Sequence, residues 1–240
     1  MNELLFFVTL AINFAGILLA YRIFGKSGLF VWIGFATVVA NIEVTKSIDM
    51  FGLSVTLGNV IYGTIFLATD ILSENYGGKE ARKGVMIGFF TTVVFTIMSQ
   101  INLLFIPNEQ DFVSGAMETV FSIMPRICIA SIVTYLISNT LDTYSYEIIK
   151  NRFPNHLWLR NNGSTMTSQL IDSFLFTFLA FAGVFEFWQV VELSLTTYAI
   201  KVIVAACDTP FIYLSKKIFK KEGCLKPKSS QKWRKEKSNT

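Results

Sequence analysis

The sequence predicts an all-α polytopic membrane protein, a bundle of six to seven transmembrane helices. The first observation is composition: 52% of the 240 residues are hydrophobic and 16% are charged, whereas soluble domains usually contain about 25% charged residues. The second is length, because the apolar residues gather in stretches close to the roughly 20 residues that one helix needs to cross a bilayer. The third is that basic and acidic loops alternate between these stretches.

Seven apolar segments make up most of the chain, and each is expected to form a helix. They cover about residues 4–24, 28–47, 53–75, 83–106, 117–143, 165–187 and 192–217. The third and the last are the most polar, so six spans with one re-entrant or peripheral segment also fit. No basic residue precedes the first segment and no small-residue cleavage site follows it, which favours a retained span over a cleaved signal peptide.

The charges of the loops predict the orientation. Lys and Arg gather in the first, third and fifth loops and after residue 215, whereas the fourth and sixth loops contain only acidic charges. Because cytoplasmic loops are enriched in Lys and Arg, seven spans would place the N-terminus outside and the C-terminus inside the cell membrane. Residues 1–217 are expected to form the transmembrane domain, and residues 218–240 a disordered basic tail beside anionic lipid.

Charged residues also remain inside or at the rim of the apolar segments. A charge at the bilayer centre costs at least about 2.5–3.5 kcal/mol, so these side chains should face the bundle interior and find partners there. Asp70 and Glu74 lie four residues apart and should share one helix face. The others that we expect to need partners on neighbouring helices are Arg126, Lys201 and Asp208, with Asp172 and Arg126 as the leading candidates for Lys201 and Asp208.

A short pattern occurs twice near the middle of the chain. Residues 138–142 and 168–172 both read Ser, amide, any residue, aliphatic, Asp, and they start thirty residues apart. Ser and Asp at this spacing share a helix face, so each pattern presents a hydroxyl and a carboxylate together.

Other classes of function lack support in the sequence. The three Cys residues and the single His form no metal-ligand cluster, so no metal site is expected. No ATP-binding loop, zinc-protease motif or nucleophile elbow occurs, so we expect no catalytic residue, no cofactor and no enzyme. The basic tail has no soluble nucleic-acid-binding surface beside it, so nucleic acid is not an expected partner.

Several motifs together resemble a known family. They are Thr69-Asp70-Ile71 with Glu74 and Tyr76-Gly77, then Arg126-Ile127, Ser168-Gln169 with Asp172, and finally Lys201, Asp208 and Pro210. This set is similar to the queuosine precursor transporters, vitamin-uptake-like membrane proteins that are related in fold to the substrate-binding components of energy-coupling-factor transporters. The resemblance covers about residues 30–215.

The resemblance implies uptake of 7-cyano-7-deazaguanine or 7-aminomethyl-7-deazaguanine through the cytoplasmic membrane for tRNA queuosine salvage. A guanine-like edge needs hydrogen-bond acceptors and a donor, and a planar ring stacks on aromatic side chains. We therefore expect the base to bind between the second and sixth spans, and Asp70 and Glu74 to lie in the cytoplasmic half of the substrate pathway. The residues expected to line the pocket are Asn41, Lys46, Gln169 and Asp172.

The sequence leaves two mechanisms open, with the carrier as the leading one and the binding subunit as the alternative. The chain is either a carrier that moves the base by itself or a substrate-binding subunit that needs a separate ATPase module. A membrane enzyme or sensor is a third, weaker reading. The coupling ion and the oligomeric state, including a homo-oligomer, stay open at this point.

Overall fold

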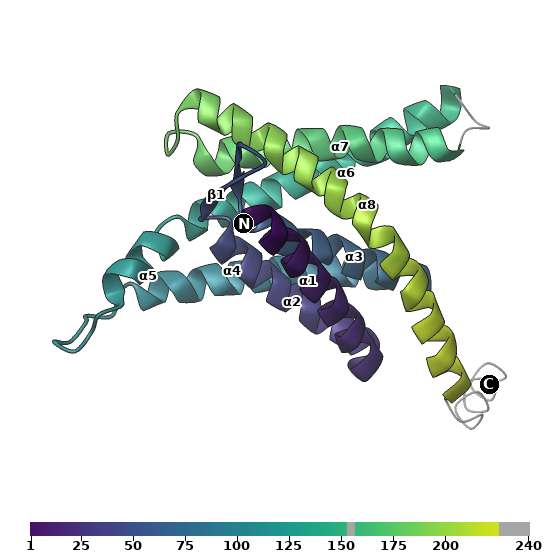
Figure 1. Cartoon of the computed structure of the whole chain (residues 1–240), viewed down its shortest axis with the longest axis horizontal. Helices are drawn as coiled ribbons and strands as arrows, with labels where there is room; N and C mark the ends of the chain where they lie inside the picture. Colours follow the sequence, from purple (N-terminus) through teal and green to yellow (C-terminus); the bar gives the residue numbers. More distant parts are fainter. Residues whose placement is uncertain (153–156, 226–240) are drawn as a thin grey trace, which may run out of the picture.

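The computed structural model describes the backbone of residues 1–152 and 157–225 and most of their side chains. Within these ranges the chain forms eight helices and one antiparallel pair of strands (Figure 1). The helices and strands are α1 Asn2–Phe24, α2 Lys26–Glu43, β1 Ser47–Met50, β2 Leu53–Thr56, α3 Asn59–Tyr76, α4 Gly78–Asn102, α5 Ser114–Phe121, α6 Met124–Arg152, α7 Leu157–Phe181 and α8 Phe187–Leu225.

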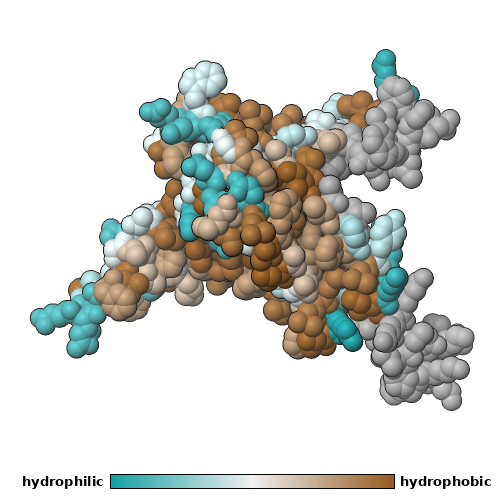
Figure 2. Space-filling model, in the orientation of Figure 1, coloured by the Kyte–Doolittle hydropathy of each residue, from teal (hydrophilic) through white to brown (hydrophobic). Residues whose placement is uncertain are grey.

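The helices have the length and composition of membrane spans, which confirms the predicted fold class. In the part of the chain that the structure describes, four segments are long and apolar enough to cross a bilayer, namely Asn2–Phe24, Gly78–Asn102, Ser114–Ser138 and Phe187–Val204. Large apolar side chains such as Leu4, Phe90 and Ile129 are exposed on the outer faces of the bundle. Figure 2 shows this hydrophobic surface, with hydrophilic residues gathered at tips such as the loop between α4 and α5.

The turns that contain most of the described basic residues lie together at one end of the bundle. Lys26, at the start of α2, lies 3.1 Å from Glu80 at the start of α4. Lys216, in the C-terminal part of α8, lies 2.9 Å from Glu74 near the end of α3. The connections after α1 and α3 and the later part of α8 therefore lie at the same end, which we call the basic end.

The N-terminus lies at the opposite end, beside β1 (Figure 1). The side chain of Asn2 donates to the backbone oxygen of Asp49 in β1 over 2.6 Å. The backbone nitrogen of Ser54 in β2 donates to Glu192 of α8 over 2.9 Å. This hairpin end thus joins the N-terminus, the α2–α3 connection and the start of α8. The N-terminus and the later part of α8 therefore lie at opposite ends of the bundle.

The hairpin itself was not predicted, because residues 47 and 53–56 were assigned to helical spans. Helix α2 ends at Glu43, and the chain then forms β1 and β2, with Ser47 paired to Thr56 and Met50 to Leu53. The two turn residues, Phe51 and Gly52, both have positive φ, at 56° and 76°. Positive φ at both central positions is the requirement of a tight type I′ hairpin turn.

Two further boundaries differ from the expected segments. The expected fifth span, 117–143, is divided into α5 and α6 by a break at residues 122–123. Helix α8 continues past the expected boundary at residue 217 to Leu225. Residues 226–240 of the expected tail lie outside the described residues, as do the side chains of Asp142 and Asp208.

Helix α3 packs in the middle of the bundle and approaches α8 closely at Gly63. A Cβ atom added to this glycine would lie 2.4 Å from Cγ1 of Val204 on α8. Leu67 and Ile71 of α3 are fully buried, and Val204 is 2% exposed. The close contact between α3 and α8 positions the polar side chains that flank it.

Candidate functional site

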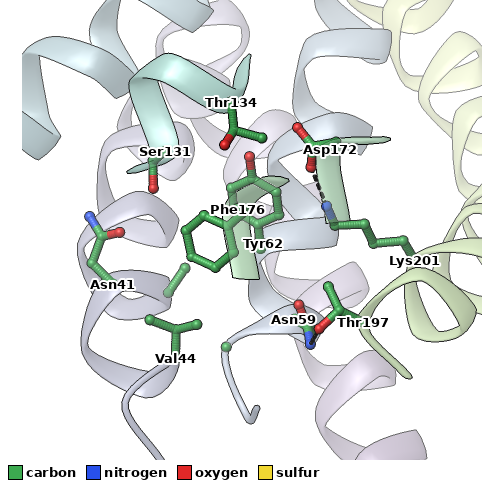
Figure 3. Close-up of a pocket in the computed structure, with 12 residues that line it drawn as sticks. Asn41, Val44, Asn59, Tyr62, Ser131, Thr134, Asp172, Phe176, Thr197 and Lys201 are labelled. Atoms are coloured by element: carbon green, nitrogen blue, oxygen red, sulfur yellow. Dashed lines mark hydrogen bonds and ion pairs between the residues drawn. The ribbon is translucent and has the colours of Figure 1, made fainter. Parts of the chain in front are cut away.

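A small polar cavity lies where α2, α3, α6, α7 and α8 meet, and we call it the central cavity (Figure 3). Its volume is about 40 Å³. Two aromatic rings, Tyr62 and Phe176, stand between Asn41 on one side and Lys201 on the other. The lining residues are Ala40, Asn41, Val44, Gly58, Asn59, Tyr62, Ser131, Thr134, Asp172, Phe176, Thr197 and Lys201.

A buried ion pair forms one wall of this cavity. The ammonium of Lys201 on α8 contacts Oδ2 of Asp172 on α7, and the two residues are 9% and 6% exposed. Oδ1 of Asp172 accepts a hydrogen bond of 3.0 Å from Ser138 of α6. The ammonium also lies 5.6 Å from the centre of the Tyr62 ring, within the range of a cation–π contact. Both carboxylate oxygens of Asp172 are therefore engaged by the protein.

Two buried polar atoms on the walls of the central cavity have no hydrogen-bond partner among the described residues. Asn41 is 8% exposed and Thr134 is 2% exposed. Nδ2 of Asn41 and Oγ1 of Thr134 make no hydrogen bond, although both side chains line the cavity. An unsatisfied buried polar group costs about 1–3 kcal/mol. These atoms are therefore available to hydrogen-bond a polar molecule that enters the cavity.

The wall near the hairpin end is held by side-chain hydrogen bonds. Nδ2 of Asn59 on α3 donates to Oγ1 of Thr56 over 3.0 Å and to Oγ1 of Thr197 on α8 over 3.2 Å. Thr196 of α8 donates to the backbone oxygen of Ser54 over 2.8 Å. These bonds fix the hairpin and α8 against α3.

Two larger cavities adjoin the central one. The Asp70 cavity has a volume of about 330 Å³ and lies between α2, α3, α4 and α6. It shares Asn41, Tyr62 and Ser131 with the central cavity. Sites for small molecules usually measure about 300–1,000 Å³, so the Asp70 cavity has the size of such a site and the central cavity is too small to be one alone.

The third cavity, which we call the hairpin cavity, lies at the hairpin end. Its volume is about 270 Å³, and its walls come from α1, the hairpin, α3 and α8. It shares Asn59 with the central cavity. The three cavities thus follow one another from the hairpin end toward the basic end, with shared residues at each junction.

Only part of the expected pocket comes together. Asn41 and Asp172 both line the central cavity. Lys46 does not: it is exposed and lines the hairpin cavity instead, because α2 ends three residues earlier and the chain turns into β1. Gln169 is half-buried and lines none of the three cavities, although its Oε1 atom is buried without a partner. The charged donor at the central cavity is Lys201 rather than Lys46.

The two carboxylates of α3 have different surroundings. Asp70 lines the cavity named after it. Glu74, one turn nearer the basic end, is exposed and pairs with Lys216, and it lines none of the three cavities. Sharing a helix face therefore does not bring both carboxylates into one site.

Arg126 is held by backbone oxygens at the end of α7. Its Nε atom donates to the backbone oxygen of Leu179 over 2.8 Å, and its Nη2 atom donates to that of Ala182 over 2.5 Å. These carbonyls end α7, where orphan backbone oxygens favour a cation. Arg126 therefore caps a helix. The partner expected for Asp208 stays a prediction, because that side chain lies outside the described residues.

Sequence reasoning missed the hydroxyls that α6 contributes. Ser131, Thr134 and Ser138 follow each other at intervals of three and four residues, so they share the helix face that meets α7. This spacing was a usable signal. The repeated Ser–Asp pattern was another, since Ser138 of the first copy donates to Asp172 of the second.

Comparison with known proteins places the chain among transporters. Residues 56–215 match the family described as "Putative vitamin uptake transporter". A Bacillus subtilis protein named "Probable queuosine precursor transporter" is 48% identical over 209 residues, which are 86% of this chain and 91% of the relative. The chain belongs to the queuosine precursor transporter family.

More distant relatives in this family bear the same name. The "Queuosine precursor transporter" of Escherichia coli is 25% identical over 171 residues, which are 69% of this chain and 74% of that protein. No solved structure matches the chain. The match to the transporter family includes Asp70, Asp172 and Lys201 but begins after Asn41.

Proposed function

We propose that this chain imports a queuosine precursor base, 7-cyano-7-deazaguanine or 7-aminomethyl-7-deazaguanine, across the cytoplasmic membrane for tRNA queuosine salvage. The family membership supports the class of substrate, since relatives at 48% and 25% identity are both named for queuosine precursors. The observation that supports the site is a polar, partly unsatisfied cavity between aromatic rings inside a bundle of membrane helices.

The chemistry of the cavity suits a guanine-like edge. Such an edge presents N–H donors beside a carbonyl oxygen. The free amide nitrogen of Asn41 can donate to the carbonyl, while the oxygens of Thr134 and Ser131 can accept from the N–H groups. The rings of Tyr62, Phe66 and Phe89 offer faces on which a planar heterocycle can stack. These side chains can thus replace the hydrogen bonds that the base loses when it leaves water.

The sizes of the cavities suggest where the base lies. The central cavity, at about 40 Å³, is too small for a bicyclic base, whereas the Asp70 cavity has about 330 Å³. We place the ring system in the Asp70 cavity, with its polar edge toward the shared wall of Asn41, Tyr62 and Ser131. The ion pair of Asp172 and Lys201 then lies behind this wall and holds α7 and α8 together.

The direction of transport follows from the charge of the two ends. The basic end is proposed to face the cytoplasm because cytoplasmic loops are rich in Lys and Arg. The hairpin cavity would then open outside the cell and the Asp70 cavity would lie on the cytoplasmic side of the central cavity. A base moving inward passes the three in that order.

Cells provide the test of this function. The chain would be expressed in a strain that lacks both queuosine precursor synthesis and its own transporter, with nanomolar precursor in the medium. Queuosine in tRNA should reappear only when the chain is present. A matched Asn41→Leu variant, made at the same level, should restore much less. Equal queuosine with and without the chain would contradict the proposal.

A further inference from the structure

The two intramembrane aspartates that face the cavities differ in what they contact. Asp172 is occupied on both oxygens, by Lys201 and by Ser138. Asp70 is exposed on the wall of a cavity of about 330 Å³. Among the side chains that the structure describes, none forms an ion pair or a hydrogen bond with Asp70. Asp70 is thus a carboxylate within a membrane helix that pairs with no cation among the described side chains.

The surroundings of Asp70 are neutral and aromatic. The same cavity is lined by the hydroxyls of Thr37, Thr69, Thr92 and Ser131 and by the aromatic rings of Tyr62, Phe66, Phe89 and Tyr135. The neighbouring carboxylate, Glu74, is already paired with Lys216. A carboxylate in a membrane segment is costly unless a positive charge approaches it. The cavity is therefore lined by one carboxylate and several aromatic rings, and its volume is that of a small-molecule site.

An organic cation fits this cavity better than a metal ion. No group of three or more metal-binding side chains occurs in the described residues, and a metal ion would leave most of the 330 Å³ unfilled. A primary ammonium on a planar ring uses both features, because the ring stacks on the aromatic side chains and the ammonium pairs with the carboxylate.

We propose that Asp70 binds the primary ammonium group of a cationic substrate and so distinguishes cationic from neutral precursors. This inference rests on the proposed function, whose two substrates differ in this respect: the aminomethyl base bears an ammonium group and the cyano base does not. The aminomethyl group is attached to the five-membered ring, on the far side from the N–H donors of the guanine-like edge. One molecule can therefore reach Asn41 with that edge and Asp70 with its ammonium.

Affinity measured for both bases separates this role from a structural one. The purified full-length chain in detergent would be titrated with each base, as wild type and as Asp70→Asn. Loss of the ion pair should weaken binding of the aminomethyl base at least about tenfold, which is about 1.4 kcal/mol, and change binding of the cyano base less than about twofold. Asp70→Glu keeps the charge and should retain most of the preference.

A matched control removes a carboxylate one turn away. Glu74→Gln eliminates an exposed, already paired carboxylate on the same helix, and it should leave the affinities for both bases unchanged. The inference would be overturned if Asp70→Asn weakened the binding of both bases equally, or if it changed the affinity for neither. Equal weakening together with loss of uptake driven by a pH gradient would assign Asp70 to proton coupling instead.

Failure of the proposed function would look different. Wild-type protein that binds neither base would contradict the proposed function itself. If the wild type binds both bases and Asp70→Asn keeps the same preference for the aminomethyl over the cyano base, only the role of Asp70 is contradicted. Size-exclusion profiles of each variant show that it is folded. Because no described side chain bonds to the Asp70 carboxylate, the profiles should resemble that of the wild type.

Discussion

Lys201 of α8 forms an ion pair with Asp172 of α7, and both side chains are buried in the bundle. The pair joins α7 to α8, the helix that follows it in the chain. Ser138 of α6 donates to the same carboxylate, so three helices meet at one charged group. Removing one charge would leave the other buried and unpaired.

The first prediction concerns the stability of this pair. Lys201→Met or Asp172→Asn alone should lower the free energy of unfolding by about 3–5 kcal/mol, because the remaining charge loses its partner. The double variant Lys201→Met/Asp172→Leu should recover much of the loss, since no buried charge remains. Thermal unfolding in detergent measures both. A double variant less stable than either single one would show that the pair is not the cause.

The second prediction separates binding from stability at Asn41. Its amide nitrogen is buried without a partner, so Asn41→Leu removes an unsatisfied group and should leave the thermal unfolding midpoint unchanged or raise it. The same change removes a donor proposed for the base and should weaken binding at least about tenfold. Ile42→Leu, at the exposed neighbouring position, is the control and should alter neither. A large drop in stability for Asn41→Leu would mean that the amide has a structural role.

The third prediction tests the close contact of α3 with α8. Gly63→Ala puts a Cβ atom 2.4 Å from Val204, and overpacking of this kind costs about 1–3 kcal/mol. Val204→Ala should largely rescue it, which a double-mutant cycle measures. Gly115→Ala, where nothing lies within 4 Å of the added atom, should have little effect. If the losses of unfolding free energy caused by Gly63→Ala and Val204→Ala were purely additive, the two residues would not be in this contact.

The fourth prediction concerns orientation. In a variant without Cys128, Cys207 and Cys224, single cysteines would be placed at two exposed positions, Glu109 and Lys79. Intact cells treated with a membrane-impermeant maleimide should label Glu109→Cys at once and Lys79→Cys only after permeabilisation. The reverse pattern would place the basic end outside and reverse the proposed direction of transport.

Charge placement explains why much of this fold could be predicted. A lysine or aspartate in an apolar segment must face the interior, and that rule led to Lys201 and Asp172 as partners. The alternation of basic and acidic loops likewise indicated which connections share an end, as the contacts of Lys26 with Glu80 and of Lys216 with Glu74 show.

The errors arose where apolar content is ambiguous. Leu53 and Val55 of β2 are apolar enough to have been assigned to the third span, but they alternate with polar residues as a strand does. Lys46 was assigned to the pocket as a charged donor on a span expected to reach residue 47, but α2 ends at Glu43. The carbonyl contacts of Arg126 were not predicted, because no sequence pattern reveals which helix end will lie near a guanidinium.

The central claim is that this chain alone moves a queuosine precursor base across a membrane. The most direct measurement is uptake of radiolabelled 7-aminomethyl-7-deazaguanine into liposomes that contain only the purified full-length chain. The account predicts uptake that saturates with substrate, is inhibited by excess unlabelled base and is greatly reduced in Asn41→Leu. Binding of the base without any uptake would contradict the claim and would indicate a capture subunit that needs a separate ATPase module.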